Sequence, residues 1–158
     1  MEILKYVACS LLFASINLIT VAQSQVPLAT IYHKGSPLVQ IEKQKNEYVF
    51  YRIQDGSCLG RWDGQQVYVA QSRVQKGITR GGQWFDAQQR LLYTVEEAGE
   101  GKLLINHPLI GTCRVIQYDL PLLFGTEYHW QWHTSATVYQ LLYTIAIYFV
   151  YFHPTPLC

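Results

Sequence analysis

The main pattern between residues 25 and 118 is a series of short apolar strands separated by polar turns. Residues 47–53 are rich in aromatic and β-branched side chains, which are typical of strands. Asp55-Gly56 follows this run and Asp63-Gly64 comes eight residues later. Both pairs favour two-residue hairpin turns, because glycine tolerates positive φ. With a further strand expected over residues 66–70, this spacing predicts a tight antiparallel meander.

The strand pattern resumes after a basic, glycine-containing segment at residues 73–82, which we expect to be a loop. Residues 83–86 and 90–95 are expected to form the next hairpin, and residues 102–105 and 112–118 the last strands. The predicted fold class is therefore mainly β, an antiparallel meander of stacked hairpins.

A faint internal repeat accompanies these hairpins. Residues 62–69 and 85–95 share an order of aromatic, Asp, small, Gln, Gln, then Tyr and a β-branched residue, and residues 31–41 form a looser third copy. Hairpins of this kind cannot bury a face alone, so they stack on one another. Over residues 31–95 the pattern is similar to small bacterial domains of repeated hairpins, such as the four-fold β-flower type. The resemblance implies stacked hairpins and carries no catalytic residues across.

The N-terminus has the layout of a secretory signal peptide. Lys5 precedes an apolar run at residues 6–21, and Ala22-Gln23-Ser24 offers small residues at alternate positions, as a cleavage site does. We therefore expect residues 1–24 to be a signal helix and the protein to be secreted or periplasmic. An uncleaved N-terminal anchor is the alternative, because the run is nearly long enough to span a bilayer.

The composition changes after Arg114, because no Lys or Arg follows it and half of the 22 aromatic residues lie beyond it. Residues 136–152 contain no charge and would span about 25 Å as a helix, against about 30 Å for a bilayer core. This segment could contact or anchor in a membrane, pack on the β domain as a helix, or form buried strands. We expect three regions: residues 1–24, a β domain at 25–118, and an aromatic tail at 119–158.

Polar residues of that tail share one helical face: they recur three or four positions apart at Thr137, Gln140, Thr144, Tyr148 and Tyr151. A narrow polar stripe on an apolar helix suits packing against a partner helix or against the β domain.

Four cysteines are present, of which Cys9 would leave with the signal peptide. Cys58 and Cys113 are the expected disulfide in an oxidising compartment, where their bond would stabilise the fold by about 4 kcal/mol. Two buried free thiols are the alternative. Cys158 is the last residue and is expected to pair between molecules or to stay idle.

The small number of charged residues limits the kinds of molecule that the protein is expected to bind. Charged residues make up 15% of the chain and the net charge is +1, so nucleic acid is excluded as a partner, since phosphate binding needs a strong basic excess. No cofactor is expected. On a helix, His129 and His133 would share one face and could hold a metal with Glu127 as an oxygen ligand, yet two histidines alone leave a tetrahedral zinc site incomplete. On a strand they share one face with Gln131, opposite Trp130 and Trp132, and need no metal.

Two groups of residues are candidates for ligand binding. Tryptophan supplies large contact area at low entropic cost, and we expect exposed rings at Trp62, Trp84, Trp130 and Trp132. The basic loop offers charges beside aromatics that would suit an anionic glycan or lipid headgroup, at Arg73, Lys76 and Arg80.

The function expected from these features is an exported, non-enzymatic binding or envelope-associated module, with a membrane or an envelope polymer as partner. One alternative is a small secreted hydrolase with a histidine base at His107, His129 or His133. Another is an accessory subunit anchored in the membrane through residues 136–152.

Overall fold

The computed structural model describes residues 26–118 and 127–158, which form eleven β-strands followed by one helical segment. The predicted signal peptide, with Cys9, lies outside the described residues. The strands are β1 (Ala29–His33), β2 (Ser36–Gln44), β3 (Glu47–Arg52), β4 (Cys58–Trp62), β5 (Gln66–Val69), β6 (Gln75–Arg80), β7 (Gln83–Asp86), β8 (Leu91–Glu97), β9 (Lys102–His107), β10 (Gly111–Gln117) and β11 (Tyr128–Trp132). The helical segment consists of the α-helix α2 (Val138–Ile147) and one π-helical turn, η1 (Tyr148–Phe152).

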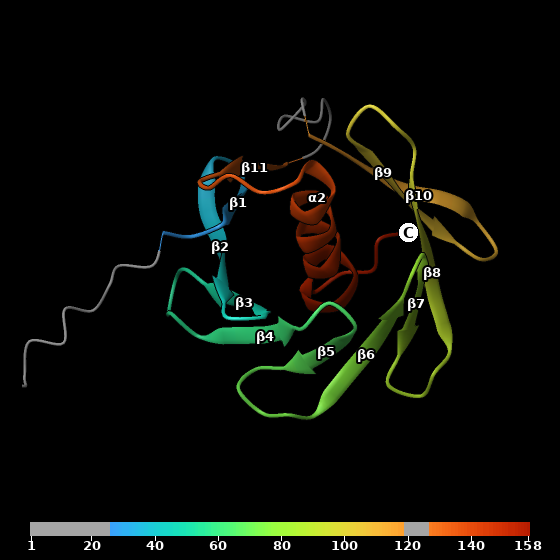
Figure 1. The fold of residues 1–158 in the computed structure, drawn as a ribbon, viewed down its shortest axis with the longest axis horizontal. Helices are drawn as coiled ribbons and strands as arrows, with labels where there is room; N and C mark the ends of the chain where they lie inside the picture. The colour runs from blue at the N-terminus through green and yellow to red at the C-terminus, as the bar shows by residue number, and fades with distance from the viewer. Residues whose placement is uncertain (1–25, 119–126) are drawn as a thin grey trace, which may run out of the picture.

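All eleven strands belong to one antiparallel sheet that curls around the helix. Each strand from β1 to β9 pairs with the next in the chain, and β11 adds beside β1 (Figure 1). The sheet therefore ends in two edge strands, β10 and β11. The predicted antiparallel meander is confirmed.

The two Asp-Gly turns lie where the sequence places them, between β3 and β4 and between β4 and β5. Asp55 accepts hydrogen bonds from the backbone and hydroxyl of Ser57, and these bonds lower the pKa of its carboxyl. Asp63 likewise accepts from the backbone N–H of Gln66 at 2.7 Å, and Gly64 adopts φ +99°. The carboxylates thus have structural positions at turns.

The basic segment at residues 73–82 is not the continuous loop that its glycines predict, because β6 lies within it. Gly77 sits in that strand with ordinary backbone angles, facing the helix. A Cβ atom at this position would meet the ring of Tyr151 and the carbonyl of Phe85. The glycine therefore serves close packing of helix on sheet, and its presence hides the strand from composition-based reasoning.

The apolar run at residues 136–152 contains the helical segment, which packs inside the curled sheet and forms the core with its inner face. Thr137 caps α2 by accepting a hydrogen bond from the backbone of Gln140 at 3.3 Å, and Pro154 follows the last helical turn. Leu142 and Ile145 are fully buried within the curled sheet. Among the described residues, no helix has the length and apolarity needed to cross a bilayer.

The polar stripe of this segment contacts the sheet. This is the second of the two expected arrangements, packing against the β domain rather than against a partner helix. Gln140 hydrogen-bonds to Tyr48 on β3. The hydroxyl of Tyr151 donates to the carbonyl of Phe85 at 2.9 Å, and burial raises the pKa of this phenol. Residues 127–158 therefore share one sheet and one core with residues 26–118.

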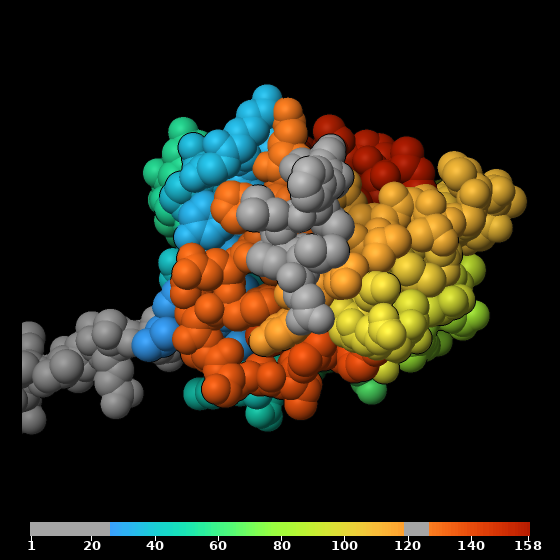
Figure 2. All heavy atoms as spheres, turned by 90° about the horizontal axis from the view of Figure 1, so that it is seen from above, coloured from blue at the N-terminus to red at the C-terminus, as the bar shows by residue number. Residues whose placement is uncertain are grey.

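The predicted Cys58–Cys113 disulfide is wrong. Cys113 on β10 pairs with Cys158, with Cα atoms 5.4 Å apart. Cys58 lies on β4, six strand positions from β10 along the sheet, and is a half-buried free thiol whose pKa burial raises. In Figure 2 the C-terminal residues (red) lie against the segment coloured gold, which includes β10.

Gly77→Ala tests the close packing of helix on sheet. We expect it to lower the free energy of unfolding by about 1–3 kcal/mol, because the added methyl group collides with Tyr151. Urea unfolding measures the change. Tyr151→Leu in the same chain trims the ring, so the double variant should lose less stability than the two single losses added together. If the losses of unfolding free energy in the two single variants add exactly in the double variant, the methyl group does not contact the ring of Tyr151, and the proposed close packing is wrong.

Candidate functional site

The inner face of the sheet is filled by the helix, so the surface available to a ligand is the outer face. Along β2, Val39 and Ile41 are buried in the core while Gln40 and Glu42 alternate with them on the other side. The same alternation places polar side chains outward on β3, β4 and β5. The outer face of β2–β5 is therefore mainly polar, with Val49 of β3 as a buried apolar member.

A row of hydrogen-bonded side chains crosses the outer face of β2 and β3. Glu42 accepts from the amide of Gln40 at 2.7 Å and from that of Gln44 at 3.0 Å. The Gln44 amide also donates to the hydroxyl of Tyr51 at 3.0 Å. Val49, fully buried yet outside the core cluster, lies between these positions. The row is pre-ordered, because each member holds its neighbour.

An ion pair continues this surface onto β4. Arg61 donates through Nη1 to Glu47 at 3.1 Å, and both side chains are about one-third exposed. The Nε atom of Arg61 is buried and has no hydrogen-bond partner among the described residues. One face of this guanidinium is thus fixed by the protein, while part of its donor capacity is unused.

Two adjoining hollows open beside this ion pair, with volumes of about 500 Å³ and 180 Å³. Glu47, Arg61 and Arg73 line both of them, and we call the combined feature the arginine depression. The larger hollow also includes Lys45, and the smaller includes Tyr68. Three cationic side chains therefore face one carboxylate, which makes the depression electropositive.

The phenol of Tyr68 is a neutral donor at the wall of the arginine depression. Burial, then the negative charge of Asp63, raises its pKa, while Arg73 lowers it. Its hydroxyl donates to Gln66 at 2.6 Å. The group therefore offers a ring face and an oxygen acceptor to a bound molecule.

His129 on β11 and His133, which directly follows that strand, share the outer face, as the strand interpretation predicts. The ring of His129 stacks on Tyr32 with centroids 4.6 Å apart. The Nε2 atom of His133 lies 2.8 Å from the hydroxyl of Thr30. Among the described residues, no three His, Cys, Asp or Glu side chains gather as a metal site.

Two of the three candidate histidine bases, His133 and His107, are held by contacts with neighbouring residues. Thr30, the partner of His133, is buried, so its hydroxyl cannot reach a substrate. His107 accepts a backbone hydrogen bond from Leu109 at 3.2 Å and packs against Tyr93. These contacts are those of structural side chains.

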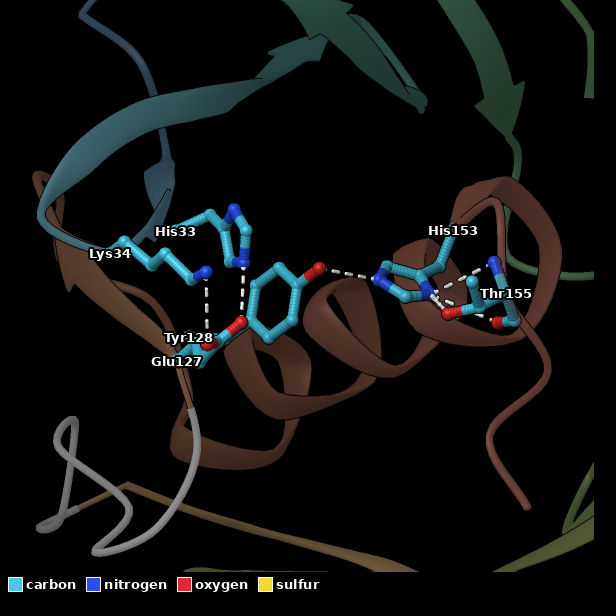
Figure 3. A network of polar contacts seen from close by, with 6 residues as sticks. All are labelled: His33, Lys34, Glu127, Tyr128, His153 and Thr155. Atoms are coloured by element: carbon cyan, nitrogen blue, oxygen red, sulfur yellow. Dashed lines mark hydrogen bonds and ion pairs between the residues drawn. The ribbon is translucent and has the colours of Figure 1, made fainter.

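A second polar network links Glu127 to the β1–β2 hairpin and Tyr128 of β11 to the residue after η1 (Figure 3). Glu127 accepts from His33 at 2.9 Å and from Lys34 at 3.1 Å, and these two contacts lower the pKa of its carboxyl. The hydroxyl of Tyr128 on β11 lies 2.7 Å from Nε2 of His153, which follows η1. The network therefore ties an edge strand to the end of the helix.

The expectation of exposed tryptophans is wrong for three of the four. Trp62, Trp84 and Trp130 are at most 8% exposed and belong to the core around the helix. Trp132 is half-buried and stacks on Tyr118, with centroids 5.9 Å apart. Large apolar rings on the inner face stabilise the fold by packing, which removes them from any ligand surface.

The three basic candidates are separated by the structure. Arg73 lines the arginine depression. Lys76 lies with its ammonium 5.4 Å from the ring of Phe152, and desolvation lowers its pKa. Arg80 lines a different hollow, at the turn between β6 and β7. Only Arg73 thus joins the site, whereas Glu47, Arg61 and Tyr68 are absent from the sequence-based candidates.

No protein-family model matches the chain, and no curated protein and no solved structure matches it either. The similarity to four-fold β-flower domains therefore stays a prediction.

Proposed function

We propose that the protein is an exported, non-enzymatic binding module that contacts a hydroxyl-rich envelope polymer through the outer face of β2–β5. The observation that carries this proposal is the arginine depression, open to solvent beside a pre-ordered row of amide and carboxylate groups. Polar groups fixed by their neighbours bind a ligand with little loss of side-chain freedom.

The shape of the molecule favours an extended ligand on the outside. The helix fills the space enclosed by the sheet, with Leu142, Ile145 and Phe149 almost entirely buried. The hollows of the outer face are shallow and lie along neighbouring strands. A chain-like molecule can follow such a surface and contact successive polar side chains, and sugar hydroxyls match amide groups because both donate and accept.

The proposed export is supported by the cysteine chemistry. A bond between Cys113 and Cys158 is consistent with an oxidising compartment, either extracellular or periplasmic. The signal-like layout of residues 1–24 supports the same compartment.

Affinity electrophoresis tests the proposal: the mobility of the native protein is measured in gels containing dextran, hydroxyethylcellulose or polygalacturonate and compared with its mobility in a gel without polymer. We expect at least one polymer to retard the protein. Gln44→Ala should weaken that binding about fivefold, because it removes the amide that links the row to the depression.

Gln83→Ala is the matched control, since it removes an exposed strand glutamine on β7, away from the depression. It should leave the retardation unchanged. Unaltered mobility of the native protein in all three gels would contradict the proposed function.

A further inference from the structure

We infer that the arginine depression is a carboxylate-binding site, and that the module recognises an acidic polysaccharide whose uronate groups enter it. This inference rests on the proposed function and names its ligand class.

The floor of the site is a guanidinium held in place by the protein. Arg61 lies within the sheet on β4, paired opposite Val49 on β3, and its Nη1 atom is fixed by Glu47 at 3.1 Å. Its Nε atom is buried, so a ligand carboxylate would meet the guanidinium through its Nη atoms. Arginine donors in a planar fork match the two oxygens of a carboxylate, and a pre-positioned fork loses less freedom on binding.

The rim supplies the additional charge. Arg73 is exposed at the loop between β5 and β6, and it lines both hollows with Arg61. Lys45 stands at the hairpin between β2 and β3 with φ +55°, on the wall of the larger hollow. With Glu47 as the one opposing carboxylate among the lining side chains, the depression carries a net charge of about +2, which favours an anion.

The neighbouring groups favour a sugar acid over a small inorganic anion. Gln44 and Asn46 line the larger hollow, and Tyr68, Gln71 and Ser72 line the smaller one. They present amides, hydroxyls and one aromatic ring around the cations. An anion with hydroxyl groups on a ring can use all of these, whereas a bare anion uses only the charges and the hydrogen-bond donors.

The carboxylate of Glu47 limits the strength of each contact. It competes with a ligand carboxylate for Arg61, so a single uronate should bind weakly. A polymer presents many such groups at high effective concentration and should be retained far better than its monomer.

Polygalacturonate and its fully methyl-esterified form provide a matched pair of probes, because they share a backbone and differ in the carboxylate. In affinity electrophoresis, we expect the acid form to retard the protein at least tenfold more strongly than the ester. Arg73→Gln and Arg61→Gln should each weaken binding of the acid form at least fivefold. Arg80→Gln, which removes one positive charge from a separate hollow, should change it less than twofold.

Arg73→Gln changes an exposed loop side chain, so it keeps the test valid if Arg61→Gln does not fold. Equal binding of the acid and ester forms, with both arginine variants behaving as wild type, overturns the carboxylate site and leaves the proposed function standing. Retention by heparin but not by polygalacturonate also overturns it, because the site then selects sulfate. Absence of retardation by every polysaccharide, esterified or not, overturns both.

Discussion

Replacing Cys158 with serine is expected to lower the free energy of unfolding by about 4 kcal/mol. Cys158 is bonded to Cys113 on β10, which pairs with β9 and lies at one edge of the sheet that the described residues form. The bond closes a segment of 45 residues that includes the helix, so its loss frees the unfolded chain and releases a sheet edge. Urea unfolding of the purified protein measures the change.

Two controls accompany this measurement. Cys58→Ser alters the free, half-buried thiol and should cost no more than about 1 kcal/mol. Dithiothreitol should destabilise the wild type and Cys58→Ser, but leave Cys158→Ser unaffected. A large loss at Cys58 combined with a neutral Cys158→Ser variant would show that the disulfide joins other cysteines.

Trp84→Ala is expected to cost about 3–5 kcal/mol, the usual range for removing a fully buried large aromatic ring. Trp84 on β7 is 1% exposed and packs between Tyr143 of α2 and Tyr151 of η1, with ring centroids 6.1 Å away in each case. The variant leaves a cavity at the contact between helix and sheet. Thermal unfolding followed by circular dichroism measures the loss.

Leu109→Ala is the control for this substitution, because Leu109 is 90% exposed at the hairpin between β9 and β10. It should change stability by less than about 0.5 kcal/mol. A Trp84→Ala variant as stable as Leu109→Ala would show that Trp84 lies on the surface, where the sequence analysis expected it.

Turn chemistry made most of the meander predictable. Asp55-Gly56 and Asp63-Gly64 reveal hairpins because few other residue pairs satisfy such turns. The strand β6 was not predicted, because glycine is typical of loops and Gly77 was expected to lie in one. In the structure this glycine lies within β6, where it allows the helix to pack closely on the sheet. Residues 136–152 stayed ambiguous between membrane contact, buried helix and strand, since an apolar run has the same composition in all three settings. Only the surrounding sheet decides among them.

The disulfide and the tryptophans show a different limit. Spacing along the chain does not reveal that Cys58 and Cys113 lie six strands apart, or that the tail returns to β10. Trp62 lies between Arg61 and Asp63, and Trp84 follows Gln83. Such a pattern marks a face of the strand without saying whether that face points inward. Both rings were therefore expected on the surface. In the structure they lie on the inner face of the sheet, which the helix covers.

The candidate site was predictable only in part. Arg73 was predicted because it belongs to a cluster of positive charges. Glu47 and Arg61 were not predicted, because single charged residues that alternate with apolar ones are ordinary on the exposed face of a strand. Their proximity depends on the pairing of β3 with β4, in which Val49 faces Arg61. Register is a tertiary property, so the depression emerges only when the strands are assembled.

Hydrogen exchange at residues 138–152 tests most directly the central claim that the sheet is built around its C-terminal helix. Mass spectrometry of the native protein without detergent should show this segment among the most protected, exchanging only through global unfolding, since its residues lie inside the sheet. Rapid exchange of these amides, with protection appearing only when lipid or detergent is added, would contradict the account.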